Sequence, residues 1–460
     1  MTVLHMSAPE IVVVLDSLAL VLSRWLPPVA RRRTALAATG VVAAGTALAA
    51  PGMRWQLLPV LAADLLVGVG AVIGRLVRRR AERAGWRARW WLALPGSVVC
   101  LGLIVAGAGA AWALPVANFP QPSGPSAVGT TVMQWTDPAR AGRAVVVQLW
   151  YPAGPVPPDT PRAQYLGRNR READIVAAAE GDYLGAPAFL LDGAVRAHSH
   201  AVSDAAPAPG RSPVVLFSPG LGGVRTQNTA WAEDLASRGY LVAGVDHPYD
   251  SAAVVLADGR TLRTRVAAGG NPGEDARRRT GWVDARAADL SFVLTRLGRL
   301  DTEPGPFTGR LDTSRAAATG HSIGGAAAMR AAERDPRFTA VINLDGGPDP
   351  DQGPLRQPVL ALTHPVEDRA DADYVALVSA ILERGTGPGY LLTVPGSAHL
   401  TFTDAPLYLP PVPALVGSSG RTESVRMTTA TCAAFLDAGL RGRGGDLPAV
   451  LSAYGDLHVW

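Results

Sequence analysis

The residues best suited to chemistry form a glycine-flanked serine motif, Gly320-His321-Ser322-Ile323-Gly324. The motif fits Gly-x-Ser-x-Gly, in which a sharp turn between a strand and a helix lifts the serine hydroxyl above the sheet. Such a turn leaves no room for side chains beside the serine, and glycine meets that demand. Residues 315–320 indicate a short buried strand, and the Ala-rich residues 324–333 indicate a helix. The sequence therefore predicts Ser322 as a nucleophile at a strand–helix turn.

A serine nucleophile needs a base to take its proton and a carboxylate to orient that base. In proteins with this motif the order along the chain is serine, then acid, then histidine. Three histidines follow Ser322, namely His364, His399 and His458. His399 follows the last predicted strand on a loop that can return over the serine. We therefore predict His399 as the base, and expect His364, directly after a strand, to be structural and His458 to lie at a frayed C-terminus.

Two aspartates are candidates for the orienting acid. Asp345 ends the strand after the nucleophile helix, and Asp368 follows the next strand along the chain. An aspartate after a strand is also a common turn former or helix cap. Spacing and motif alone leave the choice between the two open.

Acyl transfer also requires two backbone N–H groups directed at the developing oxyanion. One is expected from Ile323, next to the nucleophile, and the other from Leu221 in the glycine-rich loop 217–223. That loop lacks the Gly-x-Gly-x-x-Gly spacing of a dinucleotide site. The two cysteines, Cys100 and Cys432, show no metal-ligand spacing. We therefore expect a reaction that needs neither a cofactor nor a metal.

Beyond residue 127, short apolar runs alternate with helical stretches, which indicates an α/β domain with a mostly parallel sheet covered on both faces. Strands are expected at residues 144–150, 213–218, 241–245, 315–320, 340–344, 358–362 and 390–394. Helices are expected at residues 229–238, 281–297, 371–383 and 424–440. Residues 162–209 break this alternation and are expected to form either a lid over the site or an irregular insertion.

The first 115 residues have a different character, because long apolar stretches dominate them. Residues 34–53, 55–74 and 90–114 are each long enough to cross roughly 30 Å of hydrocarbon as a helix, and residues 11–30 are a weaker fourth candidate. We expect a transmembrane helical anchor of three or four spans over residues 1–115, a Pro-rich linker over 116–127 and a catalytic domain over 128–460.

Charge is divided unevenly between these regions. Residues 1–115 carry 12 arginines against four acidic residues, a net charge of +8, whereas the remainder carries 31 against 35, a net charge of −4. Because the basic excess is not on the folded domain, we exclude nucleic acid as a partner. The arginine-rich residues 75–89 are expected on the cytoplasmic side. That orientation makes the chain a multi-pass protein of the cell membrane with an extracytoplasmic catalytic domain.

Several of these segments, in this order, resemble the platelet-activating factor acetylhydrolase family. The matching segments are residues 217–222, 225–226, 234–239, 320–325, 335–338, 344–345 and 396–399, followed by Phe402 and Asp404. The resemblance spans about residues 129–410 and leaves the membrane region out. It implies an α/β-hydrolase fold.

The resemblance also implies roles for single residues. The family's serine falls on Ser322, its histidine on His399 and its acid on Asp345, with Asp368 as the runner-up. Its oxyanion donors fall on the Leu221 and Ile323 amides. The resemblance further implies calcium-independent hydrolysis of short or oxidised sn-2 acyl chains of phospholipids.

These observations predict a serine ester hydrolase that acts on a lipid or small ester through an acyl-enzyme. One alternative is an extracytoplasmic acyltransferase, in which an alcohol of a cell-envelope acceptor replaces water in the second step. Another is a non-catalytic, membrane-tethered binding domain. The presence of serine, acid and histidine in the required order argues against this last alternative.

Overall fold

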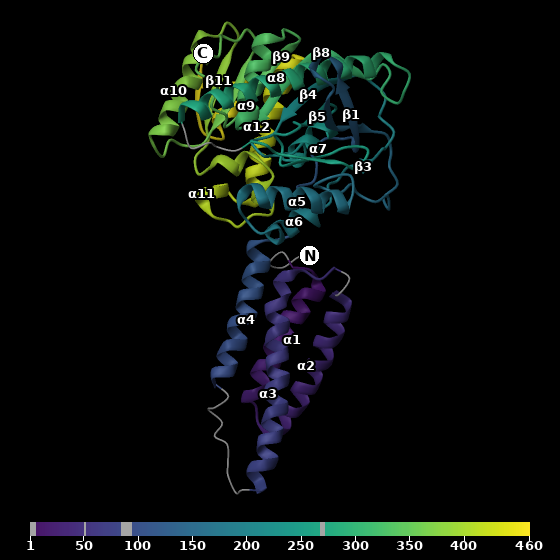
Figure 1. Cartoon of the computed structure of the whole chain (residues 1–460), viewed down its shortest axis with the longest axis vertical. Coiled ribbons are helices and arrows are strands. Elements are labelled where there is room, and N and C mark those ends of the chain that lie inside the picture. The colour runs from purple at the N-terminus through teal and green to yellow at the C-terminus, as the bar shows by residue number, and fades with distance from the viewer. Residues whose placement is uncertain (1–5, 50–51, 84–93, 267–271) are drawn as a thin grey trace. The chain divides into compact units, whose positions relative to one another are not determined.

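The computed structural model describes residues 6–49, 52–83, 94–266 and 272–460 of the chain (Figure 1). The chain divides into two compact units, Met1–Val116 and Ala117–Trp460. Each unit has its own buried core.

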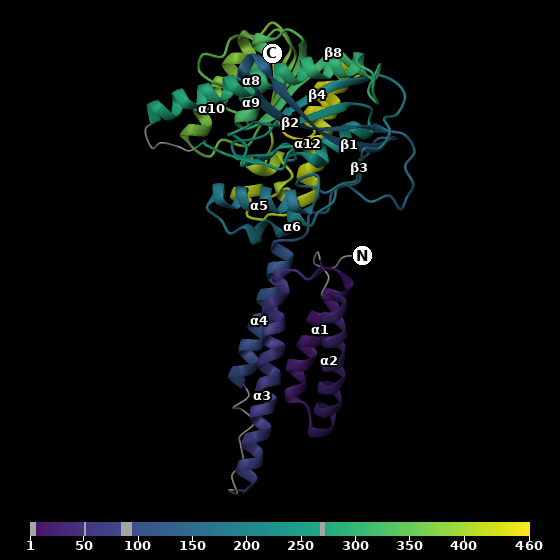
Figure 2. The same ribbon diagram turned by 45° about the vertical axis from the view of Figure 1, so that its right-hand side comes forward.

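The first unit is helical in its described part. It contains α1 (Ala8–Leu22), α2 (Pro28–Ala49), α3 (Leu58–Arg83) and α4 (Leu94–Ala113). Helix α1 packs against α2, and α3 packs against α4 (Figure 2). Val13, Val60 and Ile104 are buried where these helices meet. A buried ion pair joins Arg54 Nε to Glu10 Oε1 at 2.7 Å, so polar as well as apolar contacts hold the unit together.

Two stretches of the described residues, Trp55–Gly74 and Leu94–Ala113, are long and apolar enough to cross a membrane. The stretch predicted over residues 11–30 is not one helix. Helix α1 ends at Leu22 after 15 residues, about 22 Å of helix, and a 3₁₀ turn follows before α2 begins. Helix α2 consists largely of Ala, Thr and Gly and carries three arginines in its first turns, which lowers its hydropathy. Residues 84–93, which include part of the expected arginine-rich loop, lie outside the described residues.

The second unit is built on a sheet of ten strands in the order β12-β11-β10-β9-β8-β4-β5-β2-β1-β3. Strands β5, β4, β8, β9, β10 and β11 are parallel to one another. At one side β2 is antiparallel to both β5 and β1, and the short β3 is parallel to β1, while β12 at the other side is antiparallel to β11. The strands are β1 (Ala127–Asp137), β2 (Arg143–Ala153), β3 (Val202–Ser203), β4 (Ser212–Ser218), β5 (Leu241–Asp246), β8 (Leu311–His321), β9 (Phe338–Leu344), β10 (Val359–Thr363), β11 (Gly389–Thr393) and β12 (Asp456–Val459). A separate hairpin contains β6 (Ala253–Val255) and β7 (Thr261–Arg263).

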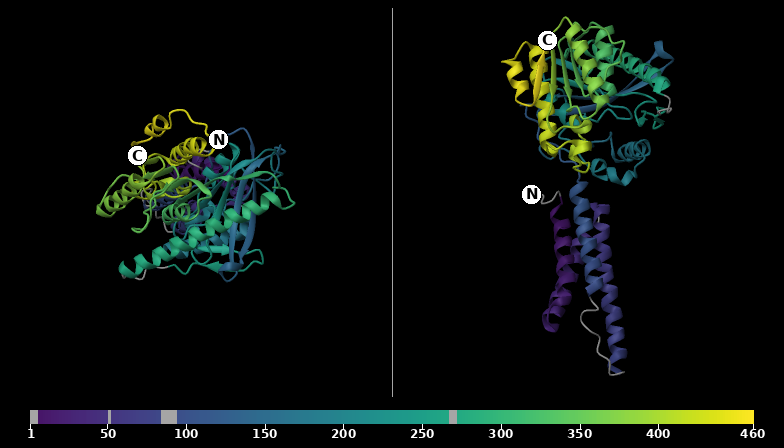
Figure 3. Two further views of the ribbon diagram at one scale, coloured as in Figure 1. Left: turned by 90° about the horizontal axis from the view of Figure 1, so that it is seen from above. Right: turned by 90° about the vertical axis from the view of Figure 1, so that its left-hand side faces the viewer.

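Helices cover both faces of this sheet (Figure 3). One face carries α8 (Pro272–Thr302), α9 (Ile323–Arg334) and α10 (Arg369–Arg384), and the other carries α7 (Thr229–Ser237), α12 (Arg421–Arg441) and α13 (Leu447–Ser452). Along β4, Val214 and Leu216 point to the first face and Val215 and Phe217 to the second. Each such buried side chain contributes about 1.5–3 kcal/mol. The predicted α/β class is confirmed.

Each predicted strand and helix of this unit is present, with ends that differ by a few residues, and α8 is longer than expected. Residues 162–209 contain α5 (Arg170–Leu184), a 3₁₀ turn (Ala188–Leu191), α6 (Asp192–Val195) and β3. Arg225 fixes this segment to the sheet, because it pairs with Glu172 at 2.7 Å and with Asp246 at 2.6 Å. The short α11 (Pro413–Val416) precedes α12. The expectation of a frayed C-terminus is wrong, because His458 lies in β12 and pairs with Leu391.

Candidate active site

Ser322 lies in a strained turn between β8 and α9. Its backbone has φ 56° and ψ −127°, in a region that residues other than glycine seldom adopt, at a cost of about 1–3 kcal/mol. The two flanking glycines are required by close packing. A Cβ on Gly320 would lie 2.2 Å from the Gly324 carbonyl oxygen, and one on Gly324 would lie 2.0 Å from the Ser218 carbonyl oxygen. The surrounding backbone therefore holds Ser322 in this conformation.

Asp345 follows β9 and has a completely buried side chain. Its carboxylate accepts hydrogen bonds from His399 Nδ1 at 2.6 Å, His364 Nδ1 at 2.9 Å and the Tyr374 hydroxyl at 2.9 Å. Burial alone would raise the pKa of Asp345, but the hydrogen bonds from His364 and His399 outweigh it and hold that pKa well below its usual range. Asp345 is therefore an ionised carboxylate that orients the His399 ring.

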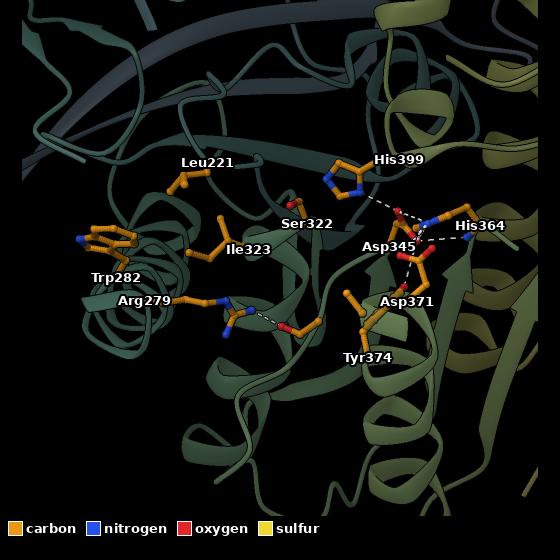
Figure 4. A pocket seen from close by; sticks show the side chains of 12 residues that line it. Leu221, Arg279, Trp282, Ser322, Ile323, Asp345, His364, Asp371, Tyr374 and His399 are labelled. Carbon is orange, nitrogen blue, oxygen red and sulfur yellow. Dashed lines mark hydrogen bonds and ion pairs between the residues drawn. The ribbon is translucent and has the colours of Figure 1, made fainter. Parts of the chain in front are cut away.

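One cavity of about 560 Å³ connects the predicted residues (Figure 4). Ser322, Asp345, His399, Leu221 and Ile323 all line it. Figure 4 shows the Ser322 hydroxyl and the His399 ring facing this cavity, with Asp345 behind the ring. The structure thus brings a hydroxyl, an imidazole and a carboxylate to one place.

Asp368, the other candidate acid, has a different position. It is exposed and precedes α10, where its carboxylate accepts a hydrogen bond from the backbone N–H of Asp371 at 2.9 Å. This is the geometry of a helix N-cap. The structure places Asp345, and not Asp368, against His399.

Leu221 and Ile323, whose backbone N–H groups are the expected oxyanion donors, both line the cavity. Ile323 is the first residue of α9, so its N–H has no partner within the helix and lies at the positive end of the helix dipole. Leu221 lies within a tight loop in which the Gly220 N–H donates to Gln227 Oε1 at 2.7 Å and the Gly223 N–H donates to the Gly220 carbonyl at 3.0 Å. Both positions suit donors to an oxyanion.

His321 contacts His399, which the motif did not indicate. Its side chain is buried, and Nε2 lies 2.8 Å from the backbone carbonyl oxygen of His399. Burial lowers the pKa of His321 to about 3, so the ring is neutral and Nε2–H donates to that carbonyl. His321 therefore fixes the backbone of His399, although the motif accepts any residue at this position.

His364 makes a contact that the sequence did not indicate. It lines the cavity and shares the Asp345 carboxylate with His399 (Figure 4). Its Nε2 lies 3.3 Å from Asp371, and its ring stacks on Tyr374. The hydrogen bond to Asp345 raises the pKa of His364 to about 9, so this ring is positively charged at neutral pH.

This elevated pKa makes the stability of the domain depend on pH. Because the folded pKa of His364 lies above its ordinary value of 6.5, its contribution is complete below pH 6.5 and is lost as the pH rises through about 9. We expect the melting temperature of the wild type, followed by circular dichroism, to fall more steeply over this window than that of His364→Gln. Parallel profiles for the two proteins would contradict the assignment.

Comparison with known proteins agrees with this architecture. Residues 113–265 and 300–441 match the family model "Platelet-activating factor acetylhydrolase, isoform II". A probable 1-alkyl-2-acetylglycerophosphocholine esterase of Arthroderma benhamiae is 34% identical over 135 residues, which cover 29% of this chain and 31% of that protein. The platelet-activating factor acetylhydrolase of Gallus gallus is 28% identical over 243 residues, 44% of this chain and 56% of that protein.

A solved structure extends the similarity over a larger share of the chain. The ferulic acid esterase of Streptomyces cinnamoneus superposes with a TM-score of 0.60 at 31% identity, and the alignment covers 75% of this chain and 99% of that one. By contrast, the chain spans about a third to just over half the length of the two curated relatives named above. The family model matches more than half of the chain, and the fold is that of an esterase. The chain therefore belongs to the platelet-activating factor acetylhydrolase isoform II family.

Proposed function

We propose that the chain is a serine ester hydrolase in which Ser322 is the nucleophile, His399 the base and Asp345 the orienting acid. The observation that carries the proposal is the 2.6 Å hydrogen bond between Asp345 and His399 Nδ1 at a cavity that Ser322 also lines. With Nδ1–H held by the carboxylate, Nε2 is free to take a proton from the serine hydroxyl.

The reaction follows from this arrangement in two halves. His399 removes the Ser322 proton while Oγ attacks the ester carbonyl, and the Leu221 and Ile323 amides donate to the oxygen that becomes negative. The C–O bond of the ester breaks, His399 gives its proton to the leaving alcohol, and an acyl-serine remains. Water then loses a proton to His399 and attacks the acyl carbon. The acid leaves, and Ser322 regains its proton.

We propose a phospholipid with a short or oxidised sn-2 acyl chain as the substrate. The names of the curated relatives support this class, because one names an esterase of 1-alkyl-2-acetylglycerophosphocholine and the other an acetylhydrolase of platelet-activating factor. The apolar side chains of Leu221, Trp282 and Ile323 at the cavity wall are suited to the acyl group.

Aromatic carboxylic esters are a second candidate substrate class. A ferulic acid esterase is one solved structure that is similar to this chain, over 99% of its own length. Trp282 of α8 lines the cavity, where an indole face can stack on an aromatic acyl group. A feruloyl ester would use the same serine chemistry.

A panel of esters distinguishes these possibilities. We expect the purified full chain to hydrolyse an sn-2 acetyl phosphocholine with a higher kcat/KM than its long-chain counterpart or methyl ferulate. A preference for methyl ferulate would favour the aromatic class. Transfer of the acyl group to an added alcohol, in place of release as free acid, would favour the acyltransferase alternative. Failure to turn over any ester would contradict the proposed activity.

We also propose that the first unit anchors the chain in the cell membrane through at least the stretches Trp55–Gly74 and Leu94–Ala113. The arginines that follow the first stretch favour a cytoplasmic position for the connection between the two, which directs the second unit outward. We expect the full chain to stay in the membrane pellet after an alkaline carbonate wash. Release into the supernatant would contradict an integral anchor.

A further inference from the structure

A completely buried arginine of α8 contacts the loop that precedes Leu221. Arg286 is 0% exposed, and its Nε and Nη2 each donate to the Asp250 carboxylate at 2.6 Å. Nη1 donates to Ser218 Oγ at 3.3 Å and to the Pro219 carbonyl oxygen, and Nη2 donates to the Gly220 carbonyl oxygen at 3.1 Å. All three guanidinium nitrogens therefore bind either one carboxylate or the turn at the end of β4.

The contact with Gly220 bears directly on the proposed oxyanion hole. The Gly220 carbonyl and the Leu221 N–H belong to the same peptide group, and in a trans peptide these two point in opposite directions. Holding the carbonyl oxygen against Arg286 turns the Leu221 N–H to the other side. A hydrogen bond from a cation to the carbonyl also polarises the peptide and strengthens its N–H as a donor.

We propose that Arg286 is a positioning residue, which aims the Leu221 N–H at the oxyanion of the transition state. The inference rests on the proposed function, because it assigns an orienting group to one of the donors of that reaction. The Gly223 N–H also donates to the Gly220 carbonyl, at 3.0 Å, but Gly223 belongs to the same turn and moves with it. Arg286 comes from a separate helix and ties the turn to the rest of the domain.

A second buried hydrogen-bond network contains Ser218, which also accepts a hydrogen bond from Arg286. Ser218 Oγ lies 2.9 Å from His247 Nε2, and His247 Nδ1 lies 2.8 Å from Asp289 Oδ2, with all three residues 0% exposed. These partners assign the direction of the chain: the Ser218 hydroxyl donates to His247, whose Nδ1–H donates to Asp289. Burial lowers the pKa of His247, which is consistent with a neutral ring.

This network has the residue types of a catalytic triad but is closed to substrate. Because the Ser218 hydroxyl donates its proton to His247, the lone pairs of Ser218 Oγ remain free to accept a hydrogen bond from Arg286. The guanidinium is thus positioned by the Ser218 hydroxyl on one side and by Asp250 on the other. Because the Arg286 guanidinium is held by these hydrogen bonds, it can keep the Gly220 carbonyl in one orientation throughout the reaction.

Two variants test the proposal without leaving a lone buried charge. Arg286→Lys keeps a cation opposite Asp250 but removes the planar fork. The double variant Arg286→Met with Asp250→Leu replaces the buried pair by apolar side chains, a change that folded proteins often tolerate. Arg441→Gln is the matched control, because Arg441 also pairs with an aspartate, Asp437 at 3.2 Å, and donates to a backbone carbonyl, but that carbonyl belongs to Arg238 and not to the Gly220–Leu221 peptide.

We expect kcat, normalised to serines titrated with a fluorophosphonate, to fall by about 10²-fold in the double variant, with KM changed less than about 3-fold. Affinity for a boronic acid, which forms a tetrahedral anionic adduct on the serine, should fall by a similar factor. Arg286→Lys should retain part of the wild-type kcat and part of the boronic acid affinity. Arg441→Gln should match the wild type in both quantities.

Folded Arg286 variants with unchanged kcat, or with a lower kcat but undiminished boronate affinity, would overturn the role of Arg286. If the double variant does not fold, Arg286→Lys gives the same readouts. Undiminished ester hydrolysis by Ser322→Ala would instead remove the proposed function, so the two failures are distinguishable.

Discussion

Replacing Ser322 by alanine is expected to lower kcat for ester hydrolysis by about 10⁶-fold. Without the hydroxyl no acyl-enzyme forms, and the oxyanion hole and binding cavity alone retain only a small residual acceleration. Stability should be little affected, because the wild-type turn already holds this residue at a positive φ and alanine adds no atoms to it. Initial rates on an sn-2 acetyl phospholipid, followed over several decades of enzyme concentration, measure the effect.

A matched control for this variant lies on the same strand. Ser314 of β8 is exposed and donates to Asp312 Oδ1, away from the cavity. Ser314→Ala should hydrolyse the ester at the wild-type rate. A Ser322→Ala protein that retained more than a few per cent of wild-type turnover would show that another group attacks the ester.

Replacing Asp345 by asparagine is expected to lower kcat by about 10⁴-fold. The carboxylate accepts the Nδ1–H of His399 at 2.6 Å and so keeps Nε2 unprotonated and ready to act as a base. An asparagine amide can present its NH₂ group to Nδ1, which stabilises the wrong tautomer. The measurement is kcat across a pH series for the wild type and the variant, with binding judged separately from KM.

The matched control for Asp345→Asn is Asp368→Asn. Asparagine caps a helix about as well as aspartate, so this change should leave both the N-cap of α10 and the rate of hydrolysis within about 2-fold of the wild type. A larger loss of kcat in Asp368→Asn than in Asp345→Asn would reverse the choice of acid.

The serine turn could be predicted because its signal is local. The glycines around Ser322 follow an apolar strand and precede an Ala-rich helix, so the sequence itself contains the strand, the turn and the helix. The choice between Asp345 and Asp368 has no local signal. It depends on which carboxylate the chain folds back to His399, and spacing does not contain that information.

Contacts between residues of neighbouring strands could not be predicted either, because they also depend on how the chain folds. Strand β10 pairs in parallel with β9 so that Leu362 lies opposite Leu344, and the residues that follow both strands meet at one edge. This register brings His364 to Asp345, whereas the sequence offered only a histidine after a strand. The burial of Arg286 and its contact with the Gly220 carbonyl could not be predicted from the sequence. One arginine among many on a long helix is typical of a solvent-exposed face.

The N-terminal region shows how composition misleads about boundaries. Apolar residues continue through residues 11–30, but the helix ends at Leu22 and a new one begins at Pro28. Proline suits the first turn of a helix and disfavours its interior. The Pro27-Pro28 pair in the sequence was therefore the more reliable guide to this boundary than the hydropathy of the stretch.

Mapping the site of a fluorophosphonate adduct tests the central claim most directly, because this reagent labels a serine only where a base and an oxyanion hole activate it. Peptide mass spectrometry of the labelled full chain should find one adduct, on Ser322. An adduct on a different residue, or continued ester hydrolysis after reagent treatment that leaves Ser322 unlabelled, would contradict the account.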